Sequence, residues 1–257
     1  MKKVFFTIMT ASMLFSCGGN SYKSELNTPA IEDFQYKVEE FADISILRYR
    51  VPDIENLTTK QKELLYYLTE AALQGRDILF DQNFKHNLPI RKVLEAIYLN
   101  AEDKTSDNFK ALELYLKQVW VANGIHHHYS GDKFVPEFTF DYFEYEFSKL
   151  PEDFKNSCFK KFTSKIDIIR AIFEPEFCAK RINQAAGVDL ILTSAMNYYD
   201  GVTQQEAEDF YDKMKDPNDL EPISYGLNSK LVKKDGKIYE DVYKVGGLYS
   251  DALKKVV

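Results

Sequence analysis

The sequence predicts an α+β protein that is mostly helical with a few strands. Three observations carry this prediction: apolar residues recur at helical spacing between residues 58 and 215, two capping boxes mark helix starts, and an Asp-Gly turn separates two alternating segments near residue 235. The 257 residues are 45% hydrophobic with only 11 Gly and 8 Pro, a composition typical of a globular chain. The net charge of −7 argues against nucleic acid as a partner, because binding phosphates needs a basic face.

The N-terminus has the pattern of an export signal. Two lysines precede an apolar stretch over residues 4–15 that is too short to span a bilayer. Ser16-Cys17 and the polar residues after it resemble a bacterial lipoprotein cleavage box, with Cys17 as the lipidated residue; an ordinary signal peptide with a chance cysteine is the alternative. We therefore expect a signal peptide over 1–17, a flexible tether over 18–34 and a folded region over 35–257. This places the protein in the bacterial cell envelope, facing the periplasm and touching the membrane only through its anchor.

The first expected elements are one strand and three helices. Residues 43–51 are β-branched and aromatic and stop at Pro52, which indicates a strand. Thr58 and Gln61 form a capping box ahead of an apolar stripe, which predicts a helix to Gly75 or beyond. Residues 90–99 and 106–121 repeat the helical period. The second of these carries its stripe through Phe109, Leu112, Leu116 and Val119.

Further helices are expected in the middle of the chain. Their periodic segments are 138–150, 154–173, 176–186 and 188–198. A second capping box, Thr203 with Glu206, opens a helix that should run to Lys215 before Pro217 stops it.

The period then changes to that of strands. A strand from Ser229, a two-residue turn inside 234–237 and a returning strand over 238–245 predict a hairpin. A hairpin needs a third strand, for which only the segment around Ile46 is a candidate. Residues 249–257 begin an amphipathic helix whose apolar side chains have no expected partner, so we expect the fold to be incomplete at the C-terminus.

Two cysteines and a run of histidines are the candidate chemical groups. Cys158 and Cys178 form either a disulfide or two separate buried thiols. If 126–128 is extended, His126 and His128 project to one face and could share a metal ion, but no third ligand accompanies them. The competing interpretation is a loop that faces a ligand or solvent. Nucleophile-elbow, phosphate-loop and dinucleotide motifs are absent from the sequence.

A second aromatic and polar loop spans Asn197–Gly201. Gly201 is expected to be the left-handed cap of a preceding helix, and the tyrosines could serve packing or binding.

Many segments together resemble the dipeptidyl peptidase III family of zinc exopeptidases, most closely its Bacteroidetes members. The likeness runs from about residue 35 to the end. The matching segments are 41–44, 47–49, 60–64, Gly75–Asn83, 94–98, Asn123–Tyr129, Lys133–Pro136, 181–187, Asn197–Phe210, Ile223–Leu231 and Lys244–Tyr249.

The resemblance implies a two-lobed enzyme that releases dipeptides from the N-terminus of short peptides. This chain would supply residues 35–257 of its β-barrel lobe, the substrate-binding wall. The family's His-Glu-x-x-Gly-His motif has no counterpart here, since no histidine is followed by Glu. The zinc of the full-length family is therefore not expected on this chain, and no catalytic residue is assigned. In such sites zinc polarises the scissile carbonyl and a glutamate activates water.

The resemblance also implies substrate-binding residues in the histidine loop. Tyr129 is the first choice, as an aromatic wall, and the other candidates are Asn123, Gly124, His127, His128 and Lys133. Extended peptides are commonly held by a strand edge with side-chain pockets beside it.

Three interpretations of the whole chain follow. The first is the N-terminal fragment of a zinc dipeptidyl aminopeptidase, itself inactive. The second is a non-catalytic, lipid-anchored lipoprotein that binds short peptides. The third is a remnant that folds poorly. The unpartnered apolar residues at the end of the chain (Leu248, Leu253, Val256 and Val257) favour the first.

Overall fold

The computed structural model describes residues 34–159, 163–221 and 223–257, and its chain divides into two compact units, one ending at Arg50 and one beginning at Val51. The expected signal peptide, the lipidated Cys17 and the tether up to residue 33 lie outside the described residues.

The first unit contains a β-hairpin. Strand β1 (Lys37–Phe41) pairs antiparallel with β2 (Ile44–Leu47), and Ala42 makes the turn with a φ of 47°. Of the strand predicted over residues 43–51, only the first half is formed, as β2. β1 was not predicted because its polar sequence KVEEF lacks an apolar alternation, and four of its five residues are exposed.

The second unit begins with a short 3-10 helix, η2 (Ile54–Asn56), followed by α1 (Thr59–Gln74) and α2 (Arg76–Asn83). The predicted capping box is confirmed: the Thr58 hydroxyl accepts from the Gln61 N–H, and the Gln61 side chain accepts from the Thr58 N–H. The apolar stripe of α1 does not enter a core, however. No residue of α1 is buried, and Leu64, Leu65 and Leu68 are each about half exposed.

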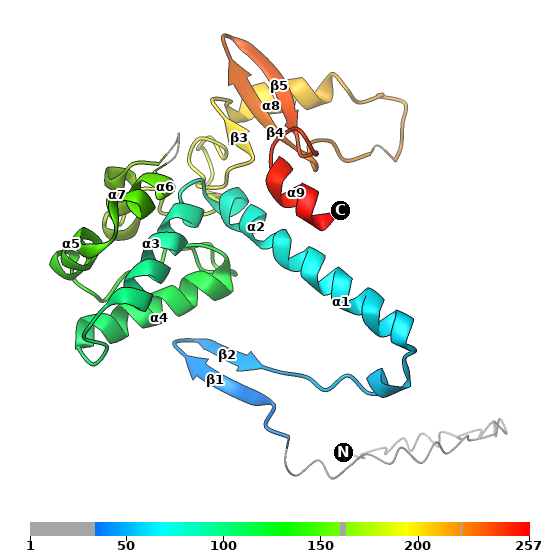
Figure 1. Ribbon diagram of the computed structural model, residues 1–257. Coiled ribbons are helices and arrows are strands. Elements are labelled where there is room, and N and C mark those ends of the chain that lie inside the picture. The colour runs from blue at the N-terminus through cyan, green and yellow to red at the C-terminus, as the bar shows by residue number, and fades with distance from the viewer. Residues whose placement is uncertain (1–33, 160–162, 222) are drawn as a thin grey trace, which may run out of the picture. The chain divides into compact units, whose positions relative to one another are not determined.

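A bundle of five helices forms the main hydrophobic core of the described residues (Figure 1). α3 (Asn87–Asn100) packs against α4 (Asp107–Ala122), and both contribute fully buried side chains. The helix predicted over 106–121 is confirmed, with its four stripe residues buried and Ser106 as N-cap. The other helices of the bundle are α5 (Phe140–Lys149), α6 (Glu152–Cys158) and α7 (Lys165–Phe173).

Three helix predictions in the middle of the chain were wrong. Residues 154–173 contain α6 and α7 as separate helices, and residues 176–186 and 188–198 form turns and irregular chain. Side chains in these segments form hydrogen bonds with nearby backbone groups, and such bonds compete with those of a helix. Asp189 accepts from the N–H groups of Ile191 and Leu192, each at 2.9 Å, and Ser194 donates to the Leu190 carbonyl.

A three-stranded sheet follows. β3 (Tyr199–Asp200) pairs parallel with β4 (Ser229–Lys234), which pairs antiparallel with β5 (Lys237–Val242). The predicted turn is confirmed by positive φ angles of 51° at Asp235 and 75° at Gly236. The third strand is β3, not the segment around Ile46. Helix α8 (Gln204–Asp212) has the expected Thr203–Glu206 capping box and packs on this sheet through Ala207.

Helix α9 (Ser250–Val256) ends the described chain and contacts α1. The expectation that the last apolar residues lack any partner was therefore wrong in part: Leu248 and Leu253 are half-buried, while Val257 is exposed. The fold is α+β, as predicted. Its described strands form two small separate sheets, which do not make the barrel that the resemblance implies. In the described ranges, no helix has the length and apolar character needed to cross a bilayer.

Candidate functional site

The histidine loop starts where α4 ends. Asn123 ends the helix in the left-handed conformation, with a φ of 52°, and Gly124 follows with a φ of 152°. A Cβ atom on Gly124 would lie 2.1 Å from the amide nitrogen of the fully buried Asn87. The side-chain Oδ1 of Asn87 in turn accepts from the Ile125 N–H at 3.1 Å. Gly124 therefore allows the loop to lie directly on Asn87.

His126 is buried in the protein rather than presented to a ligand. It is 2% exposed, and its Nε2 lies 2.7 Å from the Cys178 carbonyl oxygen. Burial lowers the pKa of His126 to about 4, so the ring is neutral at pH 7. The residues that follow make a turn, with the Gly131 N–H donating to the His127 carbonyl, so the extended run that would align His126 and His128 is not formed.

The two following histidines support the tip of the loop. His127 Nδ1 accepts from the N–H groups of Tyr129 and Ser130 at 3.2 and 3.1 Å. The His128 ring lies between its neighbours, with ring centroids 4.5 Å from His127 and 4.3 Å from Tyr129. Tyr129 itself is 87% exposed. Of the six residues proposed from the sequence, Tyr129 is the one with an open aromatic face.

Lys133 ties the loop to a segment more than forty residues later. Its ammonium group donates to the carbonyl oxygens of Glu174 and Phe177. Its backbone N–H donates to the carbonyl oxygen of Ala179. Burial lowers the pKa of Lys133. Arg181 adds a hydrogen bond to the His128 carbonyl. The loop thus holds residues 174–181 in place; its contact with a substrate stays a prediction.

The histidines and cysteines do not assemble a zinc site in the described ranges. No three His, Cys, Asp or Glu side chains group there in a way that could hold a metal ion. His86 is buried against the Thr163 hydroxyl at 2.8 Å. Cys158 and Cys178 are separate free thiols rather than a disulfide. Burial raises the pKa of both thiols, which disfavours the thiolate that zinc requires.

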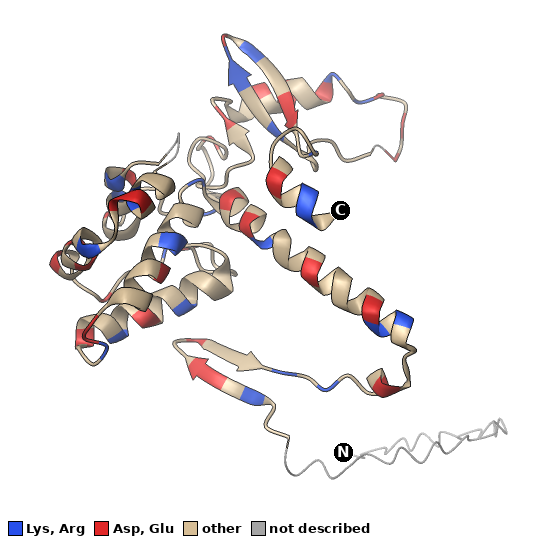
Figure 2. Ribbon diagram, viewed as in Figure 1, with Lys and Arg blue, Asp and Glu red and all other residues tan. Residues whose placement is uncertain are grey.

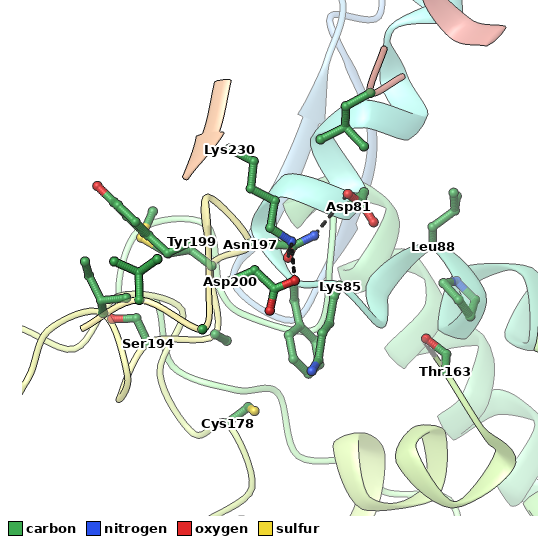
Figure 3. Close-up of a pocket in the computed structure, with 18 of the residues that line it drawn as sticks. Asp81, Lys85, Leu88, Thr163, Cys178, Ser194, Asn197, Tyr199, Asp200 and Lys230 are labelled. Atoms are coloured by element: carbon green, nitrogen blue, oxygen red, sulfur yellow. Dashed lines mark hydrogen bonds and ion pairs between the residues drawn. The ribbon is translucent and has the colours of Figure 1, made fainter. Parts of the chain in front are cut away.

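The structure contains a cavity of about 630 Å³ (Figure 3). This size suits a small ligand. The end of α2 and the turn after it form one wall, with Asp81 and Lys85, and residues 191–202 form another. Strand β4 contributes Lys230. The apolar lining includes Leu88, Pro89, Leu192, Met196 and Leu248.

A hydrogen-bonded network lies at one side of this cavity (Figure 3). Asp81 Oδ2 accepts from the Tyr249 hydroxyl at 2.6 Å and from the Asn197 amide at 3.1 Å. Asn197 Oδ1 accepts from the Lys230 ammonium group at 2.6 Å. Burial, with the hydrogen bond to Asp81, raises the pKa of Tyr249 far above its usual range. The Tyr249 hydroxyl therefore keeps its proton at neutral pH and donates it to Asp81.

The loop over Asn197–Gly201 belongs to this cavity, but not in the way the sequence suggested. Gly201 has the expected positive φ, 68°, yet it follows β3 rather than a helix. A Cβ atom there would lie 3.3 Å from the Lys233 carbonyl oxygen, so the glycine also lets the loop approach β4.

Four of the segments that carry the family resemblance meet at the network. Asp81 lies in Gly75–Asn83, Asn197 begins Asn197–Phe210, and Lys230 and Tyr249 lie in the last two segments. Sequence reasoning did not single out Asp81, Lys85 or Lys230. Only membership of these segments could have pointed to Asp81 and Lys230, and Lys85 lies outside all of them.

Comparison of the sequence with models of known protein families gives no match, and comparison with curated proteins gives no significant match either.

Proposed function

We propose that this chain is the amino-terminal, peptide-holding part of a dipeptidyl peptidase of the dipeptidyl peptidase III type, and that short peptides occupy the cavity between α2, residues 191–202 and β4. The observation that carries the proposal is the meeting of four resembling segments, distant in sequence, in one hydrogen-bonded network at one cavity. A network of this kind fixes its side chains in place, as a binding site requires.

The lining of the cavity suits a peptide. Apolar side chains can cover aliphatic or aromatic side chains of the ligand, and polar groups at one side can bond to main-chain amides and end groups. Asp81, Asp200 and Lys230 provide both signs of charge within the same space. A short peptide, with an amine at one end and a carboxylate at the other, has matching chemistry.

Peptide hydrolysis is assigned to groups beyond those described. The described residues do not fit a zinc ion, and the sequence lacks the family's metal-binding motif. We therefore expect the purified chain to bind a tetrapeptide without releasing dipeptides from it. The second interpretation, a peptide-binding lipoprotein, shares the binding and differs in needing no catalytic half.

The test is calorimetric titration of the purified chain with tetra-alanine, alongside a zinc-supplemented assay of dipeptidyl-naphthylamide hydrolysis. We expect binding and no hydrolysis. Leu192→Trp should block binding, because Leu192 lines the cavity yet is 63% exposed, so a larger ring can enter the space without disturbing the core. Robust hydrolysis would contradict the assignment of catalysis to other groups, and unchanged binding by Leu192→Trp would contradict the cavity as the site.

Tyr129→Ala separates the cavity from the histidine loop. Tyr129 does not line the cavity, and its exposure means that removing its side chain should leave stability unchanged. If the loop rather than the cavity holds the peptide, this variant loses binding while Leu192→Trp keeps it. That result would favour the role that the resemblance implies for Tyr129.

A further inference from the structure

The charged groups of the cavity differ in how far they are already paired. Asp81 accepts two hydrogen bonds, from Tyr249 and Asn197. Asp200 lies 3.9 Å from the Lys230 ammonium group and is 63% exposed to water. By contrast, the ammonium groups of Lys85 and Lys92, which also line the cavity, make no hydrogen bond or ion pair with the described residues. The charged residues of the lining are three lysines and two aspartates (Lys85, Lys92, Lys230, Asp81 and Asp200), so positive charge is in excess by one.

Lys230 is the cation best placed to meet a ligand inside the cavity. Its side chain is 15% exposed and extends from β4, a strand whose basic character is visible in Figure 2. An ammonium group has three donors, and one is used by Asn197 Oδ1 at 2.6 Å. The nearest carboxylate, at 3.9 Å, is beyond hydrogen-bond distance.

Lys85 faces the same space as Lys230. Figure 3 shows the Lys230 ammonium group beside Asn197 and Asp200, while the Lys85 side chain extends below them along the same cavity. Burial lowers the pKa of Lys230; the charges of Asp200, Asp81 and Asp241 raise it, and the charge of Lys85 lowers it. A carboxylate bound to the Lys230 ammonium group would replace the water that this group has lost on burial.

From this arrangement we infer that the cavity binds a carboxylate between Lys230 and Lys85, with the apolar part of the ligand against Leu88, Pro89 and Met196. If the proposed function holds, on which this assignment to a peptide rests, the group is the C-terminal carboxylate of the short peptide. The peptide is then anchored by its end group as well as by its main chain.

The experiment compares three probes by calorimetry with the purified chain: tetra-alanine, tetra-alanine amide and hexanoate. The amide lacks only the charge of the end group, and hexanoate keeps the carboxylate and an apolar body without any peptide bond. We expect tetra-alanine to bind about tenfold more tightly than its amide, the size of one charge-assisted hydrogen bond in a partly buried site. Hexanoate should bind detectably.

Variants assign the effect to the lysines. Lys230→Gln and Lys85→Gln should each reduce the preference for the acid over the amide to near unity. Lys110→Gln, on the exposed face of α4 and outside the cavity, should leave the preference unchanged. Thermal unfolding of each variant checks that the fold is kept, and Lys85→Gln is the safer variant because the Lys85 side chain makes no hydrogen bond or ion pair with the residues that the structure describes.

The outcomes separate this inference from the proposed function. If the acid and the amide bind equally well, the carboxylate site is wrong and peptide binding stands. If hexanoate binds in a lysine-dependent way and neither peptide does, the carboxylate site stands and the peptide assignment fails. If none of the three probes binds, both are wrong.

Discussion

Replacing Gly124 by alanine tests whether the histidine loop needs its close approach to α3. The new Cβ would lie 2.1 Å from Asn87 Nδ2 and 2.7 Å from Asn87 Cγ, far inside any real contact. Asn87 is fully buried and its Oδ1 accepts from the Ile125 N–H, so moving it away breaks a buried hydrogen bond. That loss costs about 1–3 kcal/mol, and the positive φ adds about 1–2 kcal/mol. We expect a total destabilisation of about 3 kcal/mol.

The assay is urea unfolding followed by circular dichroism, with the free energy of unfolding obtained by linear extrapolation. Gly187→Ala is the matched control, because Gly187 has a φ of 80° but its Cβ would meet nothing within 4 Å. Gly187→Ala should lower the free energy of unfolding only through the strain of its positive φ, by about 1 kcal/mol. In an Asn87→Ala background the added cost of Gly124→Ala should fall to the same value, since the two residues are in contact. Equal losses for Gly124→Ala and Gly187→Ala in the parent chain would refute this reasoning.

Three further predictions concern stability. The buried His86 and His126 each have a pKa lowered to about 4, so the unfolded chain binds more protons than the folded protein between pH 6.5 and 4. The free energy of unfolding should therefore fall by about 2 kcal/mol per histidine from pH 7 to pH 5. In urea titrations at both pH values, His126→Gln should remove one of these two contributions. Phe80→Ala, which empties a site that is 0% exposed, should cost about 3–5 kcal/mol by the same method, and a cost below 1 kcal/mol would mean that the side chain is not packed as described. Thr203→Ala removes the N-cap of α8 and should cost about 1 kcal/mol, while Thr203→Ser should restore most of it; equal losses would argue against the cap.

Local sequence predicted those elements whose causes are local. α4 and α8 have a capping residue next to a periodic apolar face, and the Asp235–Gly236 turn depends only on residues that adopt positive φ. Residues 188–198 have an apolar period too, but the Asp189 carboxylate accepts from the N–H groups of Ile191 and Leu192 and also from that of Gln204, the first residue of α8, which ties this segment to a distant part of the chain. The spacing of apolar residues alone does not reveal that such side-chain hydrogen bonds compete with helix formation.

The site was harder to predict because its contacts are distant in sequence. The histidine loop stands out by composition, but its partners are carbonyl groups of Glu174, Phe177 and Cys178, which no local pattern indicates. The cavity network joins residues 168 positions apart, from Asp81 to Tyr249. Such a site becomes visible only when the tertiary structure brings the separate segments together.

The central claim, that a short peptide occupies the cavity bounded by residues 191–202 and β4, is tested most directly by hydrogen exchange of the purified chain with and without tetra-alanine. We predict slower amide exchange over residues 194–202 and 228–232 when the peptide is present, with no change over 123–133. Slower exchange confined to 123–133, or none anywhere at saturating peptide, would contradict it.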